Sequence, residues 1–305
     1  GVTNTASIMA YGYNPFIAEW SPYHGAAYAV VEACSKVVAA GADYSRMRFS
    51  YQEYFERMTH DPHTFGKPLS ALLGALKMQV ALGLPSIGGK DSMSGTFEHI
   101  NVPPTLIAFG ITTVKADKVI SPEFKHAGNR LYLVKHTPLA NYMPNTDQLQ
   151  ANWRAVTEGI QSGRIVSAYA IGFGGVAEAI AKMSFGNQLA ANIRLSEDEL
   201  FAYNYGSILV EETPSNSPLK GENQKSPFKG DLEGLYIGEV MEGDDLIING
   251  ERISREALLK ANTAPFERIY PATSPSSCVL HPSSNQTKVI SPSSCVLHPS
   301  STTPV

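Results

Sequence analysis

The sequence predicts a mixed α+β protein built from two blocks of secondary structure. Up to about residue 125, apolar helical segments alternate with strand segments, and a second series of strands and helices begins near Gly128. A length of 305 residues suits about two domains. We therefore expect one domain over residues 1–125 and another over residues 126–270.

The first block contains two predicted helices and two predicted strands. Ala26–Ala40 is rich in Ala and Val at helical spacing, which is typical of a buried helix. Leu69–Leu82 shows the same periodicity and stops before Gly83. Met47–Ser50 and the β-branched segment Thr105–Lys115 are predicted strands.

The second block alternates strands with helices. Its strands show alternating or continuous apolar patterns, and its helices show helical spacing of apolar residues. The predicted strands are Asn129–Lys135, Ile165–Ile171, Gly206–Glu211, Leu235–Val240 and Asp245–Ile248, and the predicted helices are Asn145–Ser162 and Val176–Ser184.

Two segments are expected to lie outside the packed fold. Residues 213–231 are rich in Pro, Ser, Gly and Lys, which predicts a flexible surface insertion. In the tail, residues 271–305, the sequence SPSSCVLHPSS occurs twice. Each copy holds one Cys and one His, so the repeat is either a metal-binding motif or low-complexity sequence without a core. We favour low complexity, because the C-V-L-H spacing is not a zinc signature.

The net charge and the cysteine content indicate which binding partners and which cellular compartment to expect. The formal net charge is −4, which provides no general attraction to nucleic acid or to an anionic membrane. The cysteines Cys34, Cys278 and Cys295 fit neither a zinc pattern nor a disulfide framework. A reducing, cytoplasmic location follows as the expectation, with Cys34 as a small core residue.

The segment Gly88–Gly95, with the sequence GGKDSMSG, carries the clearest chemical signal. Its two leading glycines permit a tight backbone with positive φ and close approach of a ligand. Lys90 offers a point charge for phosphate, and Asp91 is a candidate Mg²⁺ ligand. This set of residues is typical of a loop that binds phosphate and a metal ion, although the pattern is not a Walker A motif. An ordinary polar turn is the alternative.

Four segments together resemble one enzyme family. SIGGKDSMSG resembles the VGKDSMSM loop of long-chain phosphoribosylformylglycinamidine synthases. AAYAVVEACSKVVAAG, MRFSYQEYFERM and AYAIGFGGVAEAIAKMSFGN are similar to further segments of that family, in the family's order. The resemblance implies an N-terminal, β-rich aminoimidazole ribonucleotide synthetase-like domain with flanking helices, followed by an α/β-sandwich domain.

The resemblance also implies a reaction and a binding site. These enzymes are ligases of purine biosynthesis that use ATP and Mg²⁺ to convert formylglycinamide ribonucleotide to formylglycinamidine ribonucleotide with glutamine-derived ammonia. Gln52 falls where relatives often place an Asn or Asp near ATP, and a shift of one residue would select Glu53 instead. Asp91 is the expected metal ligand. The ATP and substrate site then comprises Gly88, Gly89, Lys90, Asp91, Ser92 and Gln52.

A second, accessory nucleotide site of the family is altered in this chain. Relatives hold its Mg²⁺ with an Asp, a Glu, an Asn and a later Asp. The corresponding residues here are Asn4, Glu32, Lys36 and Ala170, and Gly172 replaces a nearby Ser. Glu32 alone is kept as a metal ligand, and Lys36 lies one helical turn away, where it is expected to pair with Glu32.

The resemblance covers only part of the complete enzyme. The first synthetase half, which carries the family's catalytic His, and the glutaminase domain have no counterpart here, so we assign no catalytic residue to this chain. We expect the isolated fragment to be inactive and its partners to be those missing parts, with a homodimer as an alternative. A non-catalytic scaffold of the same fold is the competing hypothesis. A related kinase is less favoured, because the Asp-rich cluster of such kinases is absent from the sequence.

Two further motifs each have more than one interpretation. Gly172–Gly175, with the sequence GFGG, suits either a phosphate cradle at a helix N-terminus or a plain tight turn. His60 and His63 are metal or base candidates only in principle, because two His residues in a Pro-containing loop are usually solvated.

Overall fold

A computed structural model describes residues 3–214 and 234–271 of the chain. Residues 1–262 form one compact unit, and residues 263–305 are assigned to a second. The insertion predicted at 213–231 and the tail at 271–305, including Cys278 and Cys295, lie almost entirely outside the described residues. The division predicted at residue 125 stays a prediction.

The described strands form three sheets. A four-stranded sheet has the order β1-β6-β2-β3, a seven-stranded sheet has the order β13-β12-β9-β11-β7-β10-β8, and β4 pairs with β5. The strands are β1 Thr5–Gly12, β2 Arg48–Tyr54, β3 Ser86–Lys90, β4 Thr96–Phe97, β5 Ile100–Asn101, β6 Thr105–Lys115, β7 Arg130–Val134, β8 Ile165–Ala170, β9 Ala190–Ile193, β10 Ile208–Glu212, β11 Gly234–Met241, β12 Asp245–Ile248 and β13 Glu251–Ser254.

Helices lie between these strands along the chain. They are α1 Pro15–Trp20, α2 Pro22–Ala39, α3 Pro62–Leu82, α4 Thr146–Gln161, α5 Gly175–Phe185, α6 Glu197–Leu200 and α7 Arg255–Ile269, with short 3₁₀ turns at Tyr44–Arg46 and Ala116–Lys118. Among the described residues, no helix has both the length and the hydropathy required to cross a bilayer.

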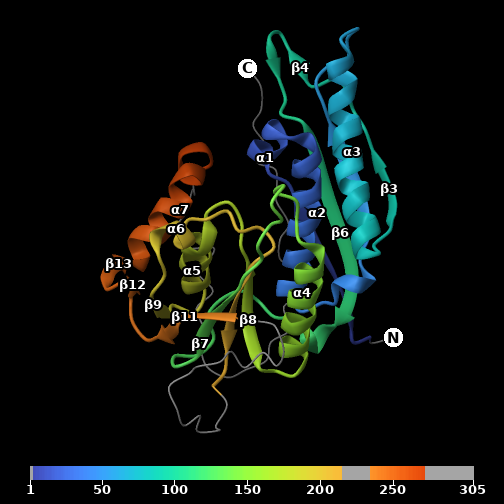
Figure 1. The fold of residues 1–305 in the computed structure, drawn as a ribbon. Helices are drawn as coiled ribbons and strands as arrows, with labels where there is room; N and C mark the ends of the chain where they lie inside the picture. Colours follow the sequence, from blue (N-terminus) through green and yellow to red (C-terminus); the bar gives the residue numbers. More distant parts are fainter. Residues whose placement is uncertain (1–2, 215–233, 272–305) are drawn as a thin grey trace, which may run out of the picture. The chain divides into compact units, whose positions relative to one another are not determined.

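Helix α2 is the central element of the first core. Ser21 caps its N-terminus and Pro22 occupies its first turn, which explains why it begins before the predicted Ala26. Its Ala and Val side chains are almost all buried, because α2 packs against the four-stranded sheet and also contacts α4 and β8 (Figure 1). Small side chains permit this close packing on several sides.

Helix α3 is longer than predicted and turns its small residues inward. It starts at Pro62 rather than Leu69, because Asp61 caps it by accepting the backbone N–H of His63 at 3.0 Å. A Cβ atom on Gly74 would lie 2.0 Å from the carbonyl oxygen of Tyr23, so this position requires glycine. Leu69, Leu72, Leu73 and Leu76 of α3 are exposed, whereas Leu82 at its end is buried.

The four-stranded sheet has one covered face and one open face. Alternate residues of β6, such as Leu106 and Ala108, are buried beneath the helices. The residues between them, such as Phe109 and Ile111, point to the other face, where Met9 and Tyr11 of β1 pair opposite them. No described helix covers this open face, which therefore presents a sheet rich in large apolar side chains.

The central strands β7 and β10 of the seven-stranded sheet are buried on both faces. Tyr132 and Val134 of β7 pack into the core that contains α2 and α4. Leu131 and Leu133 alternate with them and pack into a second core beneath α5. A strand buried on both faces explains the continuous apolar pattern of this part of the sequence. The structure thus has the α+β class that the sequence predicts.

Candidate functional site

The glycine-lysine segment forms an edge strand rather than the predicted loop. Gly88, Gly89 and Lys90 belong to β3, which pairs in parallel with β2 at one edge of the four-stranded sheet. The expectation of a loop from Gly88 onward is therefore wrong for these three residues. The loop begins only at Asp91, where the strand pairing ends.

Close strand packing explains at least one of the two glycines. Neither Gly88 nor Gly89 has a positive φ angle, so the left-handed backbone that glycine permits is not adopted at either position. A Cβ atom on Gly89 would lie 2.5 Å from the carbonyl oxygen of Tyr51, whereas a Cβ atom on Gly88 would meet nothing within 4 Å. Gly89 therefore permits β2 and β3 to approach, and Gly88 leaves the strand surface bare.

Strand register places Gln52 directly beside Lys90. The two residues are partners in the parallel ladder between β2 and β3, so their side chains leave the sheet on the same side. Gln52 is also the partner of Ile107, which lies on the open face of the sheet. The amide of Gln52 and the ammonium of Lys90, both predicted as site residues, are thus neighbours on an accessible face.

The loop after β3 is anchored by its backbone and keeps its polar side chains accessible. The N–H of Ser92 donates to the carbonyl oxygen of Glu53 at 3.1 Å, and the N–H of Phe55 donates to the carbonyl oxygen of Ser92 at 2.9 Å. Asp91 is exposed, and the hydroxyls of Ser92 and Ser94 lie 3.2 Å apart. The loop is held in place without being buried.

A buried carboxyl group, that of Glu53, lies beside this loop. Glu53 is 5% exposed, and its Oε1 atom has no hydrogen-bond partner among the described residues. Burial and, secondarily, the negative charge of Asp91 raise the pKa of Glu53 to about 7. The sequence signal was the alternation in FSYQEY, which places Glu53 in phase with the buried Phe49 and Tyr51.

Glu32, the other predicted metal ligand, lines a separate cleft. It borders a cavity of about 280 Å³ together with Lys36, Ala170 and Gly172, and Asp91 is not among the lining residues. The structure therefore does not bring the two predicted metal ligands together. Among residues 3–214 and 234–271, no group of three or more His, Cys, Asp or Glu side chains is placed to hold a metal ion.

Lys36 and Glu32 form the predicted ion pair. The Nζ atom of Lys36 lies 2.8 Å from Oε1 of Glu32, one helical turn away on α2. Asn4, aligned with a metal ligand of the family, does not line this cleft and donates instead to Oδ1 of Asp117 at 2.8 Å. Of the four positions that the resemblance assigns to an accessory site, the three at Glu32, Lys36 and Ala170 line one cleft.

Comparison with known proteins shows the fold. No protein-family model matches the chain. Thermotoga maritima PurL complexed with AMPPCP matches with a TM-score of 0.66 and 17% sequence identity, over 83% of this chain and 44% of that chain. Phosphoribosylformylglycinamidine synthase II from Thermotoga maritima matches with a TM-score of 0.63 and 18% identity, over 83% of this chain and 44% of that chain. The fold is the aminoimidazole ribonucleotide synthetase-like fold.

Another enzyme with this synthetase-like fold is also similar. Thiamine-monophosphate kinase from Stenotrophomonas maltophilia K279a matches with a TM-score of 0.56 and 13% identity, over 82% of this chain and 87% of that chain. The predicted N-terminal and C-terminal domain types are thus those observed. The chain spans less than half the length of the Thermotoga synthase chains.

The GFGG turn of this synthetase-like fold is closed by its own helix. The N–H of Gly174 donates to Oε2 of Glu178 at 2.9 Å, and Glu178 also pairs with Lys182. A Cβ atom on Gly174 would lie 2.5 Å from the Cβ atom of Glu178. Since a carboxylate of the chain already occupies the N-terminus of α5, the structure favours the tight turn over the phosphate cradle.

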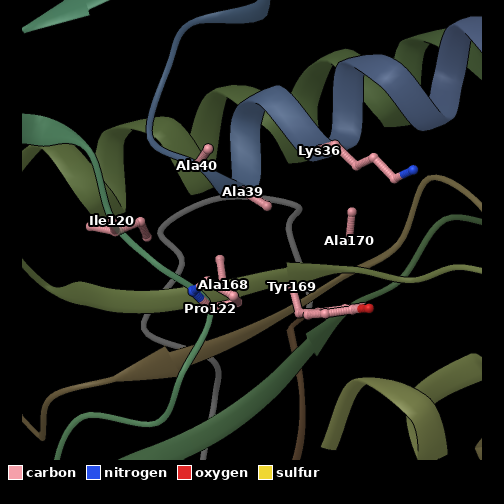
Figure 2. A pocket seen from close by; sticks show the side chains of 8 residues that line it. All are labelled: Lys36, Ala39, Ala40, Ile120, Pro122, Ala168, Tyr169 and Ala170. Carbon is pink, nitrogen blue, oxygen red and sulfur yellow. The ribbon is translucent and has the colours of Figure 1, made fainter. Parts of the chain in front are cut away.

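A smaller, mostly apolar cavity of about 230 Å³ adjoins the Glu32 cleft. Figure 2 shows Ala39 at the end of α2 and the next residue, Ala40, on one side and Ala168 and Ala170 of β8 on the other. Lys36 borders this cavity and the Glu32 cleft. Small side chains on facing elements leave this space open.

Of the two histidines predicted to lie in one loop, only His60 does so, because α3 begins at Pro62 and includes His63. His63 is exposed, and its Nδ1 atom lies 2.8 Å from Oδ1 of Asp61, which caps α3. His60 is also exposed, as expected for a solvated loop.

Proposed function

We propose that this chain is the second synthetase half of a phosphoribosylformylglycinamidine synthase, an ATP-dependent ligase that forms a C–N bond. The observation that carries the proposal is the β2–β3 register, which sets Gln52 beside Lys90 on the open face of the small sheet. The coverage of 44% of the Thermotoga chains supports the idea that the active enzyme contains more than this chain.

The reaction would join three substrates at this face. ATP transfers its terminal phosphoryl group to the amide oxygen of formylglycinamide ribonucleotide, and ammonia then displaces that oxygen as phosphate. Thermotoga maritima PurL has been solved in complexes with FGAR and with ATP. In this chain, Lys90 would hold a phosphate as a point charge, while the hydroxyl groups of Ser92 and Ser94 donate hydrogen bonds to phosphate oxygens. Gln52 would orient the bound nucleotide or substrate through its amide group.

The donor set beside the loop suits Mg²⁺. Asp91 offers an exposed carboxylate directly after Lys90, which would hold the ion together with phosphate oxygens, whereas Glu53 points to the buried side of β2 and is not part of this set. Bound there, Mg²⁺ would neutralise charge on the transferred phosphoryl group. Glu32 does not suit this role, because its carboxylate is already paired with Lys36.

The open face of the small sheet is the surface proposed for the missing first synthetase half. Met9, Tyr11 and Ile111 are 70%, 56% and 42% exposed on this face, although apolar side chains of this size are usually covered. A second sheet laid against this face would cover them and close the site around Gln52 and Lys90. The isolated chain would therefore be inactive, and a homodimer is the alternative occupant.

The experiment must distinguish the proposed synthase from two other functions, a scaffold and a kinase. A scaffold of the same fold would bind neither nucleotide nor substrate. A kinase of the thiamine-monophosphate class is favoured by one observation, the 87% coverage of the Stenotrophomonas enzyme, and would transfer phosphate to its substrate without ammonia.

The deciding experiment is co-expression of the full chain with a first synthetase half and a glutaminase domain, followed by assay of the purified complex. We expect ATP hydrolysis that requires both formylglycinamide ribonucleotide and ammonia. Lys90→Ala should lower the turnover about 100-fold, in line with the loss of a charge-assisted contact worth roughly 1.5–3 kcal/mol.

The control for that loss is Lys77→Ala, because Lys77 is also exposed but lies on α3, away from the loop. Its turnover should equal that of the unaltered chain. A stable complex without ammonia-dependent turnover would refute the proposal in favour of a scaffold. Phosphate transfer to thiamine monophosphate without ammonia would refute it in favour of a kinase.

A further inference from the structure

The Glu32 cleft contains a largely buried carboxylate, as a cation-binding site would, and the ammonium of Lys36 serves as its cation. Glu32 is only 11% exposed in its side chain, so its negative charge requires compensation. Its Oε1 atom faces the Lys36 ammonium at 2.8 Å, and its Oε2 atom accepts the backbone N–H of Tyr13 at 2.9 Å. Both carboxylate oxygens are thus committed to partners within the protein.

The surroundings of Lys36 resemble those of a bound cation. Beyond Glu32, its Nζ atom donates to the carbonyl oxygen of Tyr11 at 2.9 Å and lies 4.5 Å from the centroid of the Tyr11 ring. A carboxylate, a carbonyl oxygen and the face of an aromatic ring therefore share one ammonium group. Together they hold it in a defined position between α2 and β1.

Among the described residues that line the rest of the cleft, none offers a divalent ion a free anionic ligand. Glu178 is paired with Lys182 and accepts the N–H of Gly174. Ala170 stands on β8, where a carboxylate would have to project toward Glu32. The two acids and two lysines balance in charge, whereas a hard divalent ion needs several free oxygen ligands.

We propose that the ammonium of Lys36 is a permanent, built-in replacement for a divalent cation, so that this cleft is maintained without metal and binds no Mg²⁺–nucleotide. The synthetase-like fold would thus keep its accessory site as an internal ion pair. This inference concerns α2 and β8 and does not depend on the chemistry proposed at Lys90.

The test is a titration of Mn²⁺ alone, with the free ion measured by electron paramagnetic resonance. The single variant Glu32→Gln should bind the same number of Mn²⁺ ions as the unaltered chain. The double variant Lys36→Asn/Ala170→Asp should gain one Mn²⁺ site per chain, and adding Glu32→Gln to it should abolish the gained site. Asp91 lies outside the Glu32 cleft. Any Mn²⁺ bound near Asp91 should therefore be bound equally by all variants and by the unaltered chain.

Two outcomes would overturn the proposal. One is the loss of a bound Mn²⁺ ion when Glu32→Gln is made in the unaltered chain. The other is a folded double variant that gains no site, since this would show that Lys36 is not what excludes the metal.

A second variant keeps the test decisive if the double variant does not fold. Lys36→Met retains the length of the side chain but leaves Glu32 without a counter-ion. Millimolar Mg²⁺ should then raise the Tm of this variant by on the order of 2 °C more than it raises the Tm of the unaltered chain, in which only the region near Asp91 binds the ion. Equal shifts in both proteins, or a shift in neither, would contradict the proposal.

Discussion

At the scale of single residues, Glu53 departs most from what its position in the fold would suggest. It lies on the helix-covered side of β2, in phase with the buried Phe49 and Tyr51. An acid at such a position is costly when ionised, and one of its oxygens has no partner among the described residues. Strained polar groups of this kind gather at functional sites, which agrees with its place beside Asp91.

Glu53 should make the stability of the chain depend on pH. Its pKa is raised to about 7 in the folded chain, by burial first and by the charge of Asp91 second. Between its unfolded pKa near 4.3 and pH 7, the folded state therefore binds more protons than the unfolded state. Stability should fall as the pH rises through this window, with this residue contributing roughly 1–3 kcal/mol, and then level off.

Glu53→Gln should remove most of this slope, because glutamine does not ionise. Urea unfolding at pH 5 and pH 8 measures the effect, and the variant should be the more stable protein at pH 8. Glu242→Gln, at an exposed position, is the control and should keep the slope of the unaltered chain. Equal slopes in the Glu53 variant and the unaltered chain would show that Glu53 is ionised in the fold at neutral pH.

At the scale of elements, β3 depends on one glycine and not on the other. Gly89→Ala should separate β3 from β2, because the new methyl group would meet the carbonyl oxygen of Tyr51 at 2.5 Å. We expect a loss of about 2 kcal/mol in the free energy of unfolding. Gly88→Ala is the matched control and should change stability by less than about 0.5 kcal/mol. Similar losses in both variants, measured by urea unfolding, would contradict this explanation.

The sequence predicted long periodic elements well and short ones poorly. The strands Thr105–Lys115 and Asp245–Ile248 have the predicted bounds, because alternation or a continuous β-branched run marks them. Ala190–Ile193 and Glu251–Ser254 were not predicted, because these four-residue segments lack the continuous run of large apolar residues that marks Asp245–Ile248. The start of α3 was missed because its first turns lack a clear apolar period and contain Pro68, so only the cap at Asp61 and Pro62 in the first turn marked it.

The site was predictable in its residues but not in its geometry. Gly88 and Gly89 disfavour a strand locally, so only the pairing with β2, formed across more than thirty residues of chain, makes them one. The same non-local pairing sets Gln52 beside Lys90, which spacing along the sequence cannot show. Whether these residues bind a nucleotide stays a prediction.

At the scale of the whole molecule, the open sheet face determines how the chain should associate. The large side chains Met9, Tyr11 and Ile111 lie together on paired strands with no described helix above them. In the absence of a first synthetase half, a second copy of the chain should cover this face. We therefore expect a concentration-dependent dimer in light scattering coupled to size-exclusion chromatography.

Variants on this face should prevent that association. Met9→Glu/Ile111→Glu places two charges in the proposed interface and should give a monomer with an unchanged circular dichroism spectrum. Leu139→Glu, at an exposed loop position of similar exposure to Ile111, should leave the dimer intact. A dimer that persists in the double variant would place the interface on another surface.

The central claim is that the Gly88–Ser92 segment presents Lys90 and Gln52 to a phosphorylated ligand, and calorimetric titration of the purified chain with Mg²⁺–ATP tests it most directly. We predict weak but saturable binding that Lys90→Ala weakens about 10- to 100-fold and that Lys77→Ala leaves unchanged. Absence of binding to the unaltered chain, or equal affinity in the Lys90→Ala variant, would contradict the claim.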